Sequence, residues 1–154
     1  MTTPGFYILD GYTVYNGRGY KLEQISKKSY SAAQSACQAD NANAHLAFPV
    51  TQTDFDFVQK WLLNTAGVSV VWFGGDMSTP GVLALENGRS AEGFAINGGA
   101  YEQPPFAAGE PATQGCTLHQ ISQSGVPTGR LLGKACTLTR AYVCEIAESD
   151  LIAA

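Results

Sequence analysis

The chain has 154 residues, of which 45% are hydrophobic and 14% charged, and its formal net charge at pH 7 is −4. A chain of this length can bury roughly two-thirds of the surface that its unfolded form exposes, so we expect one compact domain and exclude disorder. The nine Lys and Arg residues are scattered and form no basic stripe, which argues against nucleic acid as a partner. No apolar run reaches the roughly 18 to 20 residues that cross a membrane, and residues 1–10 lack the pattern of a signal peptide. We therefore expect no membrane insertion.

The chain is predicted to open with a β-hairpin. Two runs of aromatic and β-branched residues, Tyr12–Tyr15 and Tyr20–Ile25, are typical of strands. They are separated by Asn16-Gly17-Arg18-Gly19, whose Asn-Gly step suits the positive φ angles of a tight turn. We expect the two runs to pair across this turn.

Two amphipathic helices are predicted next. Ser29 is placed to cap the first helix. Three residues at helical spacing form its apolar face: Tyr30, Ala33 and Cys37. Thr51 and Asp54 resemble a capping box at the start of the second helix. Its apolar stripe is formed by Phe55, Val58 and Leu62.

The second half of the chain is less regular. A buried strand is predicted at residues 68–73, because a short β-branched and aromatic run ends at Gly74-Gly75. Residues 76–115 are rich in Gly and Pro, too long for a simple connection, and too rich in Phe, Tyr and Ile for a disordered linker. We expect a long ordered loop region there, where binding function tends to sit.

Further strands are predicted at residues 116–119 and 141–145, on either side of a turn-rich stretch at 122–129. Residues 147–154 are expected to be a flexible tail or linker. The order of elements predicts the α+β class, with two helices beside a mixed, mainly antiparallel sheet.

The four cysteines form an even set without a C-x-x-C pair: Cys37, Cys116, Cys136 and Cys144. Because His45 and His119 are the only His residues, we favour two disulfides over a zinc site or free buried thiols. Disulfides imply a secreted or extracellular protein. Since no signal peptide is visible, we expect either that one was removed or that the chain is a module of a longer secreted protein.

Several short motifs, in this order, resemble the C-type lectin-like domain over about residues 6–146. They are Tyr20-Lys21-Leu22, the Ser31 to Cys37 spacing, Ala44-His45-Leu46-Ala47, Trp72-Phe73-Gly74, Gly109-Glu110-Pro111 and Ala141-Tyr142-Val143-Cys144-Glu145. The resemblance implies that Cys37 pairs with Cys144 and that Cys116 pairs with Cys136. It also implies the short form of the domain, which lacks an extra amino-terminal cysteine pair.

Many members of that family bind a sugar through calcium, which needs about six to eight oxygen ligands. The family supplies them through Glu-Pro-Asn or Gln-Pro-Asp and through Trp-Asn-Asp before the third cysteine. The matching positions here hold Glu110-Pro111-Ala112 and Leu131-Leu132-Gly133. We therefore expect neither the conventional calcium site nor any other cofactor. A differently built calcium site would have to use loop carboxylates such as Asp76, Glu86 and Glu110.

No G-x-S-x-G, H-E-x-x-H or G-x-x-x-x-G-K motif occurs, so we do not expect an enzyme. Tyr and Arg often anchor interfaces, and the candidate ligand-binding residues of the long loop are Arg89, Tyr101, Glu102 and Glu110. The leading hypothesis is an extracellular module that recognises a protein or a glycan without calcium. The alternatives are a divergent calcium-dependent lectin and a structural or matrix module of a multidomain secreted protein.

Overall fold

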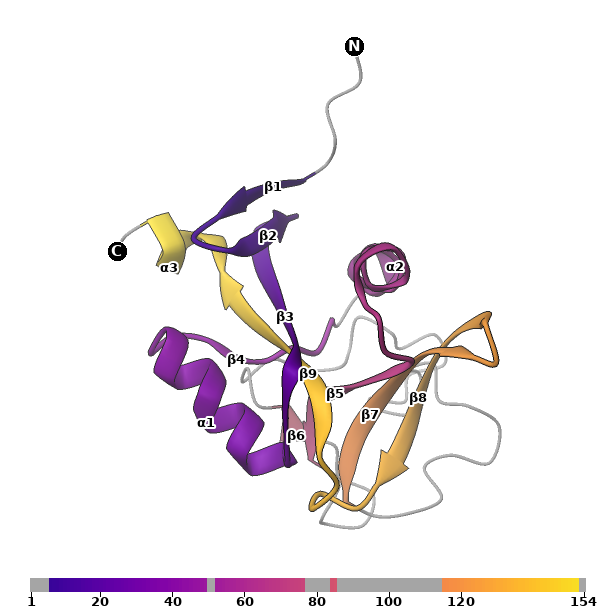
Figure 1. Ribbon diagram of the computed structural model, residues 1–154. Helices are drawn as coiled ribbons and strands as arrows, with labels where there is room; N and C mark the ends of the chain where they lie inside the picture. Colours follow the sequence, from indigo (N-terminus) through magenta and orange to yellow (C-terminus); the bar gives the residue numbers. More distant parts are fainter. Residues whose placement is uncertain (1–5, 50–51, 77–83, 86–114, 153–154) are drawn as a thin grey trace.

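The computed structural model describes residues 6–49, 52–76, 84–85 and 115–152. In chain order its elements are β1 (Phe6–Leu9), β2 (Tyr12–Tyr15), β3 (Arg18–Lys28), α1 (Tyr30–Asp40), β4 (His45–Leu46), α2 (Gln52–Thr65), β5 (Val70–Asp76), β6 (Ala84–Leu85), β7 (Cys116–Gln123), β8 (Val126–Lys134), β9 (Arg140–Ala147) and α3 (Glu148–Ile152). Figure 1 shows their arrangement.

The strands of the described residues form one mixed sheet. Its order is β1-β2-β3-β9-β5-β7-β8, with β4 paired to β9 and β6 paired to β5. The β5–β9 pair is parallel, with Val71 opposite Ala141, while the other pairs are antiparallel. The prediction of an α+β fold with a mixed, mainly antiparallel sheet is confirmed.

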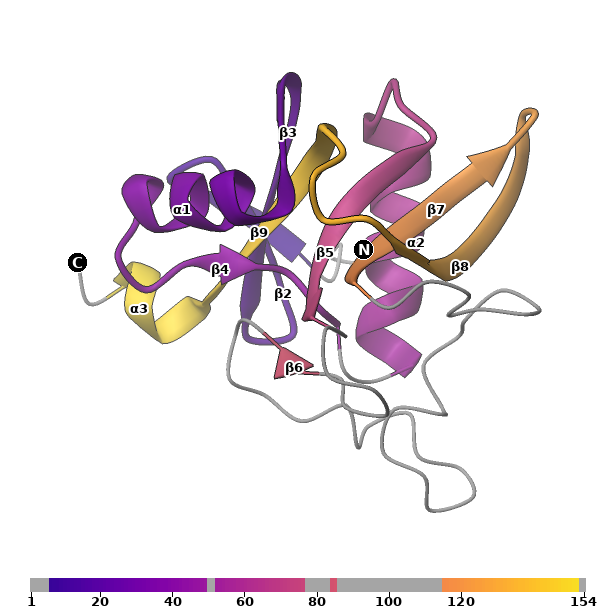
Figure 2. The same ribbon diagram turned by 90° about the horizontal axis from the view of Figure 1, so that it is seen from below.

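The two long helices pack on opposite faces of this sheet, as Figures 1 and 2 show. The cluster on the α1 side contains the helix residues Tyr30, Ala33 and Cys37. The cluster on the α2 side contains Phe55, Val58 and Leu62. Both predicted helix faces are therefore confirmed as core, and the sheet separates two hydrophobic layers.

The amino end of α1 is held by the main chain of its cap residue. Ser29 occupies the predicted N-cap position in an extended conformation, but its side chain makes no capping hydrogen bond. Its carbonyl oxygen instead accepts the N–H of Ala33 at 2.8 Å. The cap position is predictable from the sequence, whereas the capping hydrogen bond is not.

Two-residue turns connect the hairpins. Asn16 and Gly17 both have positive φ, at 52° and 83°, as the predicted Asn-Gly turn requires. The turn is shorter than the four residues expected, so β3 begins at Arg18. Ser124 and Gly125 form an equivalent turn, with φ of 51° and 81°. The predicted turn-rich stretch at 122–129 is therefore wrong, since strands occupy it on both sides of this turn.

The two ends of the described chain add elements that the sequence did not predict. β1 precedes the expected hairpin and pairs with β2. At the other end, β9 runs to Ala147 and α3 follows, so residues 147–152 differ from the expected flexible tail. Leu151 is 4% exposed and joins the cluster on the α1 side, which accounts for the order of this segment.

Several residues of the family-like motifs hold the framework together. An added Cβ on Gly74 would lie 2.4 Å from the carbonyl oxygen of Leu46, because the two strands approach closely there. The N–H of Gly74 donates to the carbonyl of Ala47 at 2.7 Å. The buried carboxylate of Glu145 accepts the N–H of Phe48 at 3.1 Å. These motif residues therefore fix main-chain geometry.

His119 lies in the core on the α2 side and is 1% exposed. Its ring stacks on Phe73, with centroids 4.5 Å apart, and meets Phe55 edge-on. Nε2 of His119 donates to Oε1 of Gln59 at 2.7 Å, while buried Nδ1 has no partner. Burial lowers the pKa of His119 from 6.5 to about 3. A proton on Nδ1 would add a buried donor without an acceptor, so neutral His119 serves as a packing residue of this core.

We predict that Gly74→Ala lowers the free energy of unfolding by about 1 to 3 kcal/mol, because the new methyl group overlaps main-chain atoms of Leu46. Urea unfolding measures this. Gly67→Ala is the matched control, since its nearest neighbour would be Oε1 of Gln24 at 3.6 Å and we expect a change within about 0.5 kcal/mol. Equal effects of the two variants would contradict the close approach at Gly74.

We predict that His119 makes stability depend on pH. Below about pH 6.5 the unfolded chain binds a proton at this residue, and the folded chain does not until about pH 3. The free energy of unfolding should therefore fall by about 2 kcal/mol more between pH 7 and pH 5 in the original chain than in His119→Phe. Urea unfolding at both pH values tests this. The prediction would be refuted if the free energy of unfolding fell by the same amount between pH 7 and pH 5 in His119→Phe as in the original chain.

Candidate functional site

The predicted ligand-binding residues of the long loop lie outside the described residues. This applies to Arg89, Tyr101, Glu102, Glu110 and the weaker calcium candidate Glu86. The remaining candidate, Asp76, ends β5, and its main chain pairs with Ala84 and Cys116. The binding role of these residues stays a prediction, and the structure describes the frame from which the loop region emerges.

That frame brings the two ends of the loop region together. β5 ends at Asp76 and β7 begins at Cys116, and these two residues are register partners in the β5–β7 pair. The hydroxyl of buried Thr117 donates to the carbonyl of Gly75 at 2.8 Å, which adds a side-chain contact to the pairing. The loop region therefore starts and ends at one fixed point of the sheet.

Both disulfides implied by the family resemblance are present. Cys37 of α1 pairs with Cys144 of β9, and Cys116 of β7 pairs with Cys136. The carbonyl of Cys136 also accepts the N–H of Tyr30 at 3.0 Å. The second disulfide thus links the returning end of the loop region to the segment that contacts the first residue of α1.

The strand before Cys136 has no calcium ligands at the three positions that match the Trp-Asn-Asp motif of the family. Leu131 is fully buried on the α2 side, whereas Leu132 packs against the cluster on the α1 side. Gly133 pairs with Thr117 in the β7–β8 ladder. These three positions of β8 offer no side-chain oxygen to a cation. Within the described ranges, no group of three or more His, Cys, Asp or Glu side chains could hold a metal ion.

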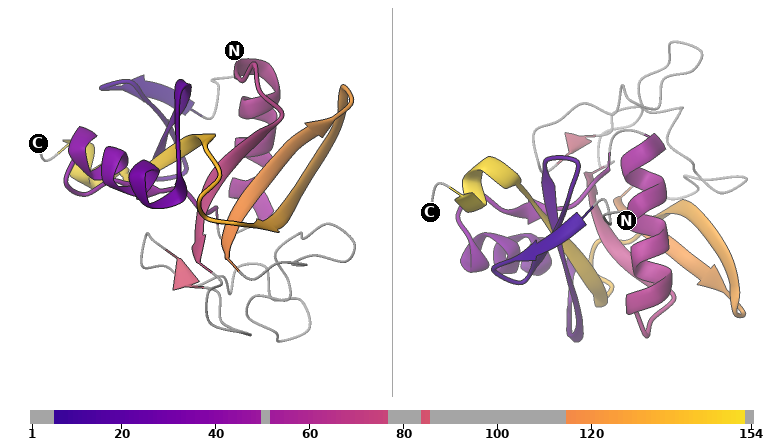
Figure 3. Two further views of the ribbon diagram at one scale, coloured as in Figure 1. Left: turned by 60° about the horizontal axis from the view of Figure 1, so that its bottom comes forward. Right: turned by 90° about the horizontal axis from the view of Figure 1, so that it is seen from above.

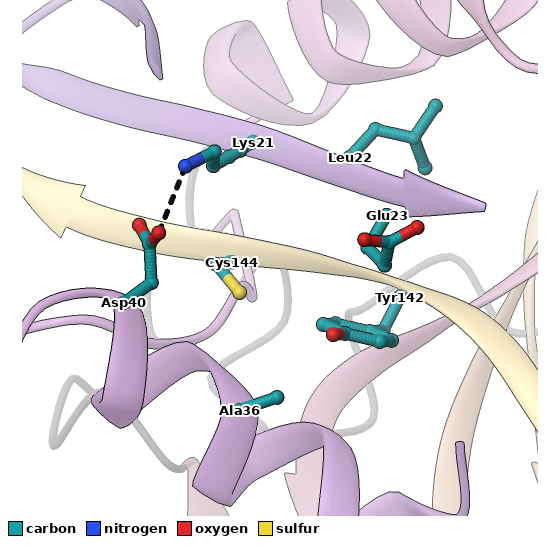
Figure 4. A pocket seen from close by; sticks show the side chains of 7 residues that line it. All are labelled: Lys21, Leu22, Glu23, Ala36, Asp40, Tyr142 and Cys144. Carbon is teal, nitrogen blue, oxygen red and sulfur yellow. Dashed lines mark hydrogen bonds and ion pairs between the residues drawn. The ribbon is translucent and has the colours of Figure 1, made fainter. Parts of the chain in front are cut away.

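A small charged pocket lies between β3, β9 and α1, with a volume of about 150 Å³. Figure 4 shows its lining residues: Lys21, Leu22, Glu23, Ala36, Asp40, Tyr142 and Cys144. Nζ of Lys21 lies 3.0 Å from Oδ1 of Asp40, and the hydroxyl of Tyr12 donates to the same carboxylate at 2.6 Å. The sequence motifs gave no sign of this pocket, since its lining residues come from three separate elements.

The charged groups of this pocket are held by the protein itself. Partial burial acts to raise the pKa of Asp40, but hydrogen bonds from Tyr12 and Lys21 lower it overall. Main-chain N–H groups of Ser26 and Ile25 lower the pKa of Glu23. Burial, together with the two carboxylates, raises the pKa of Tyr142. Because these partners are internal and the volume is below that of ordinary ligand pockets, we assign the pocket a structural role.

Comparison with solved structures shows that the chain has the C-type lectin-like fold. The C-type lectin domain of murine dendritic cell inhibitory receptor 2, solved in complex with an N-glycan, matches with a TM-score of 0.72 and 14% identity over 92% of this chain and 100% of that chain. Human lithostathine matches with a TM-score of 0.71 and 17% identity over 92% of both chains. The Ca²⁺-independent C-type lectin SPL-2 from Saxidomus purpuratus matches with a TM-score of 0.68 and 16% identity over 90% of this chain and 93% of that chain.

No protein-family model and no curated protein sequence matches the chain. At identities of 14–17%, the structural matches show a shared fold and do not identify a ligand. In the part of the chain that the structure describes, no helix has the length and apolar character of a membrane span.

We predict that the two disulfides differ in their contribution to stability. In the chain-entropy account, the stabilisation grows with the length of chain between the two cysteines. Cys37→Ala with Cys144→Ala opens a separation of 107 residues and should cost about 4.7 kcal/mol. Cys116→Ala with Cys136→Ala opens a separation of 20 residues and should cost about 3 kcal/mol. Denaturant unfolding of the two double variants measures both values, and the reverse order would contradict the prediction.

Proposed function

We propose that this C-type lectin-like domain is a ligand-recognition module that binds a protein or a glycan without the calcium site of its fold family. One observation carries the proposal. The β8 positions matched to the family's Trp-Asn-Asp hold Leu131, Leu132 and Gly133, and Leu131 is fully buried in the core. A cation that needs about six to eight oxygen ligands gains none from this strand.

The fold favours binding over catalysis. Its solved neighbours include a lectin domain in complex with an N-glycan and a C-type lectin described as Ca²⁺-independent. These properties belong to those proteins, and they show that the fold accommodates both glycan recognition and calcium independence. Together with the lack of catalytic motifs in the sequence, they support a non-enzymatic binding module.

The binding face is proposed to be the loop region, with Arg89, Tyr101, Glu102 and Glu110 as contact residues. The supporting observation is the frame, in which Asp76 and Cys116 pair at the sheet. A loop region that begins and ends at one rigid point can present side chains without disturbing the core. Sites built on such supports lose less conformational entropy on binding than sites on unanchored segments.

An extracellular location is proposed from the two disulfides, which link all four cysteines of the chain. Disulfides persist in secreted and extracellular proteins and are rare where glutathione keeps thiols reduced. The proposal therefore predicts that the chain folds only under oxidising conditions.

We predict that millimolar calcium leaves the thermal unfolding temperature of the oxidised chain unchanged relative to EDTA. Calcium at a hundred times the dissociation constant of a site would raise the free energy of unfolding by about 2.7 kcal/mol. In a domain of this size, the unfolding temperature would rise by about 5 to 10 °C. In a parallel experiment, the chain is applied to an array of printed glycans and extracellular proteins. Any ligand that it binds on the array should stay bound in EDTA. Scanning calorimetry and array binding measure the two outcomes.

The control is Glu110→Ala, which should alter neither the unfolding temperature in calcium nor the effect of EDTA. A calcium-dependent upward shift that this variant abolishes would overturn the proposal in favour of a divergent calcium lectin using residues such as Asp76, Glu86 and Glu110. Failure to bind any glycan or protein would instead favour the structural or matrix module.

A further inference from the structure

An open groove lies between the β1–β2 hairpin and α2, on the α2 side of the sheet. The right-hand view of Figure 3 shows the hairpin and this helix side by side. The groove has a volume of about 550 Å³ and is lined by Ile8, Thr13, Tyr15, Phe57, Lys60, Trp61, Asn64 and Thr65. Small-molecule sites usually enclose about 300 to 1,000 Å³, so the groove is large enough for a ligand.

The hairpin turns an apolar face toward the helix without covering it. Ile8 is the register partner of Thr13, so these residues share a face of the hairpin with Tyr15. The ring of Tyr15 stacks on Phe57 of α2, with centroids 4.0 Å apart, and this contact bridges the hairpin and the helix. Away from the bridge Ile8 remains 68% exposed. The face therefore has apolar surface that a ligand could remove from water.

The later part of α2 supplies the opposite wall. Trp61 packs its ring against Tyr20, with centroids 6.3 Å apart, and this fixes one side of the groove. Thr13, Asn64 and Thr65 add neutral hydrogen-bonding groups. The aromatic rings are thus held by the core, while the polar groups are few.

Lys60 is the one charged residue among the lining residues that the structure describes. It takes no part in the ion pairs found between described residues, which join Arg18 with Glu145 and Lys21 with Asp40. A ligand complementary to this groove would therefore combine an apolar body with a single negative charge.

We propose that the groove between the β1–β2 hairpin and α2 binds a single-chain anionic amphiphile of the fatty-acid class. The acyl chain lies along Ile8 and Trp61, and its carboxylate pairs with the ammonium group of Lys60. This site uses none of the residues assigned to the loop region, so it stands or falls independently of the proposed function.

Decanoate is the probe, and tryptophan fluorescence is the readout. The chain has two tryptophans, and Trp72 is fully buried with its indole N–H bonded to the carbonyl of Lys28 at 3.0 Å. Trp61 lines the groove and therefore reports on it. We expect a saturable fluorescence change with one decanoate bound per chain, and calorimetric titration should give the same stoichiometry.

Two variants at exposed positions test the proposed contacts of the acyl chain and of the carboxylate. Ile8→Ser should weaken decanoate binding about fivefold, because apolar contact area is lost. Lys60→Gln should weaken decanoate binding about threefold and leave binding of neutral 1-decanol unchanged. Matched controls away from the groove are Ile25→Ser, at a position that is 93% exposed, and Lys27→Gln, and both should bind like the original chain.

The absence of saturable binding to the folded chain would overturn the proposal, as would equal losses in the groove variants and their controls. Binding that depends on Ile8 but not on Lys60 would refute the anionic class. Circular dichroism of each variant establishes that a loss of binding does not come from unfolding.

Discussion

The structure depends above all on β9 as the central strand. It pairs with β3, β4 and β5, and Cys144 joins it covalently to α1. Its side chains alternate between two layers, with Tyr142 on the α1 side and Val143 on the α2 side. A shift of one residue in register would exchange the layers and separate Cys144 from Cys37, so the disulfide and the hydrophobic pattern enforce the same alignment. The other elements are placed relative to this strand.

Because the sheet is fixed in this way, the ends of β5 and β7 on either side of the loop region have fixed positions. Asp76 and Cys116 pair with each other where β5 ends and β7 begins. The family-like motif residues that the structure describes fix the close approach of main-chain segments, as Gly74 does beside Leu46. The entropy cost of closing a loop rises by only about 0.6 kcal/mol for each doubling of its length. The number of residues between Asp76 and Cys116 therefore has little effect on the free energy of unfolding.

The sequence predicted the elements whose signals are local. The apolar faces of α1 and α2 and the Asn16-Gly17 turn are confirmed because each depends on spacing or on one dipeptide. The fold class is confirmed because it follows from the order of the elements. β8 was missed because Pro127 and Gly129 interrupt its pattern, and an edge strand tolerates both. The groove, the Lys21–Asp40 pair and the order of α3 could not be predicted, because each needs distant elements to meet. The loop candidates other than Asp76 fall outside the described residues, and the binding role of all of them remains a prediction.

The position of β9 in the chain has a consequence for biosynthesis. The strand that occupies the middle of the sheet leaves the ribosome after the other described strands, and its partners β3 and β5 precede it by long stretches of chain. Until it arrives, β3 and β5 have no strand between them, and their inner edges are free to pair with other chains. Contacts this distant in sequence also form slowly. The nascent domain therefore needs protection from association until β9 has been synthesised.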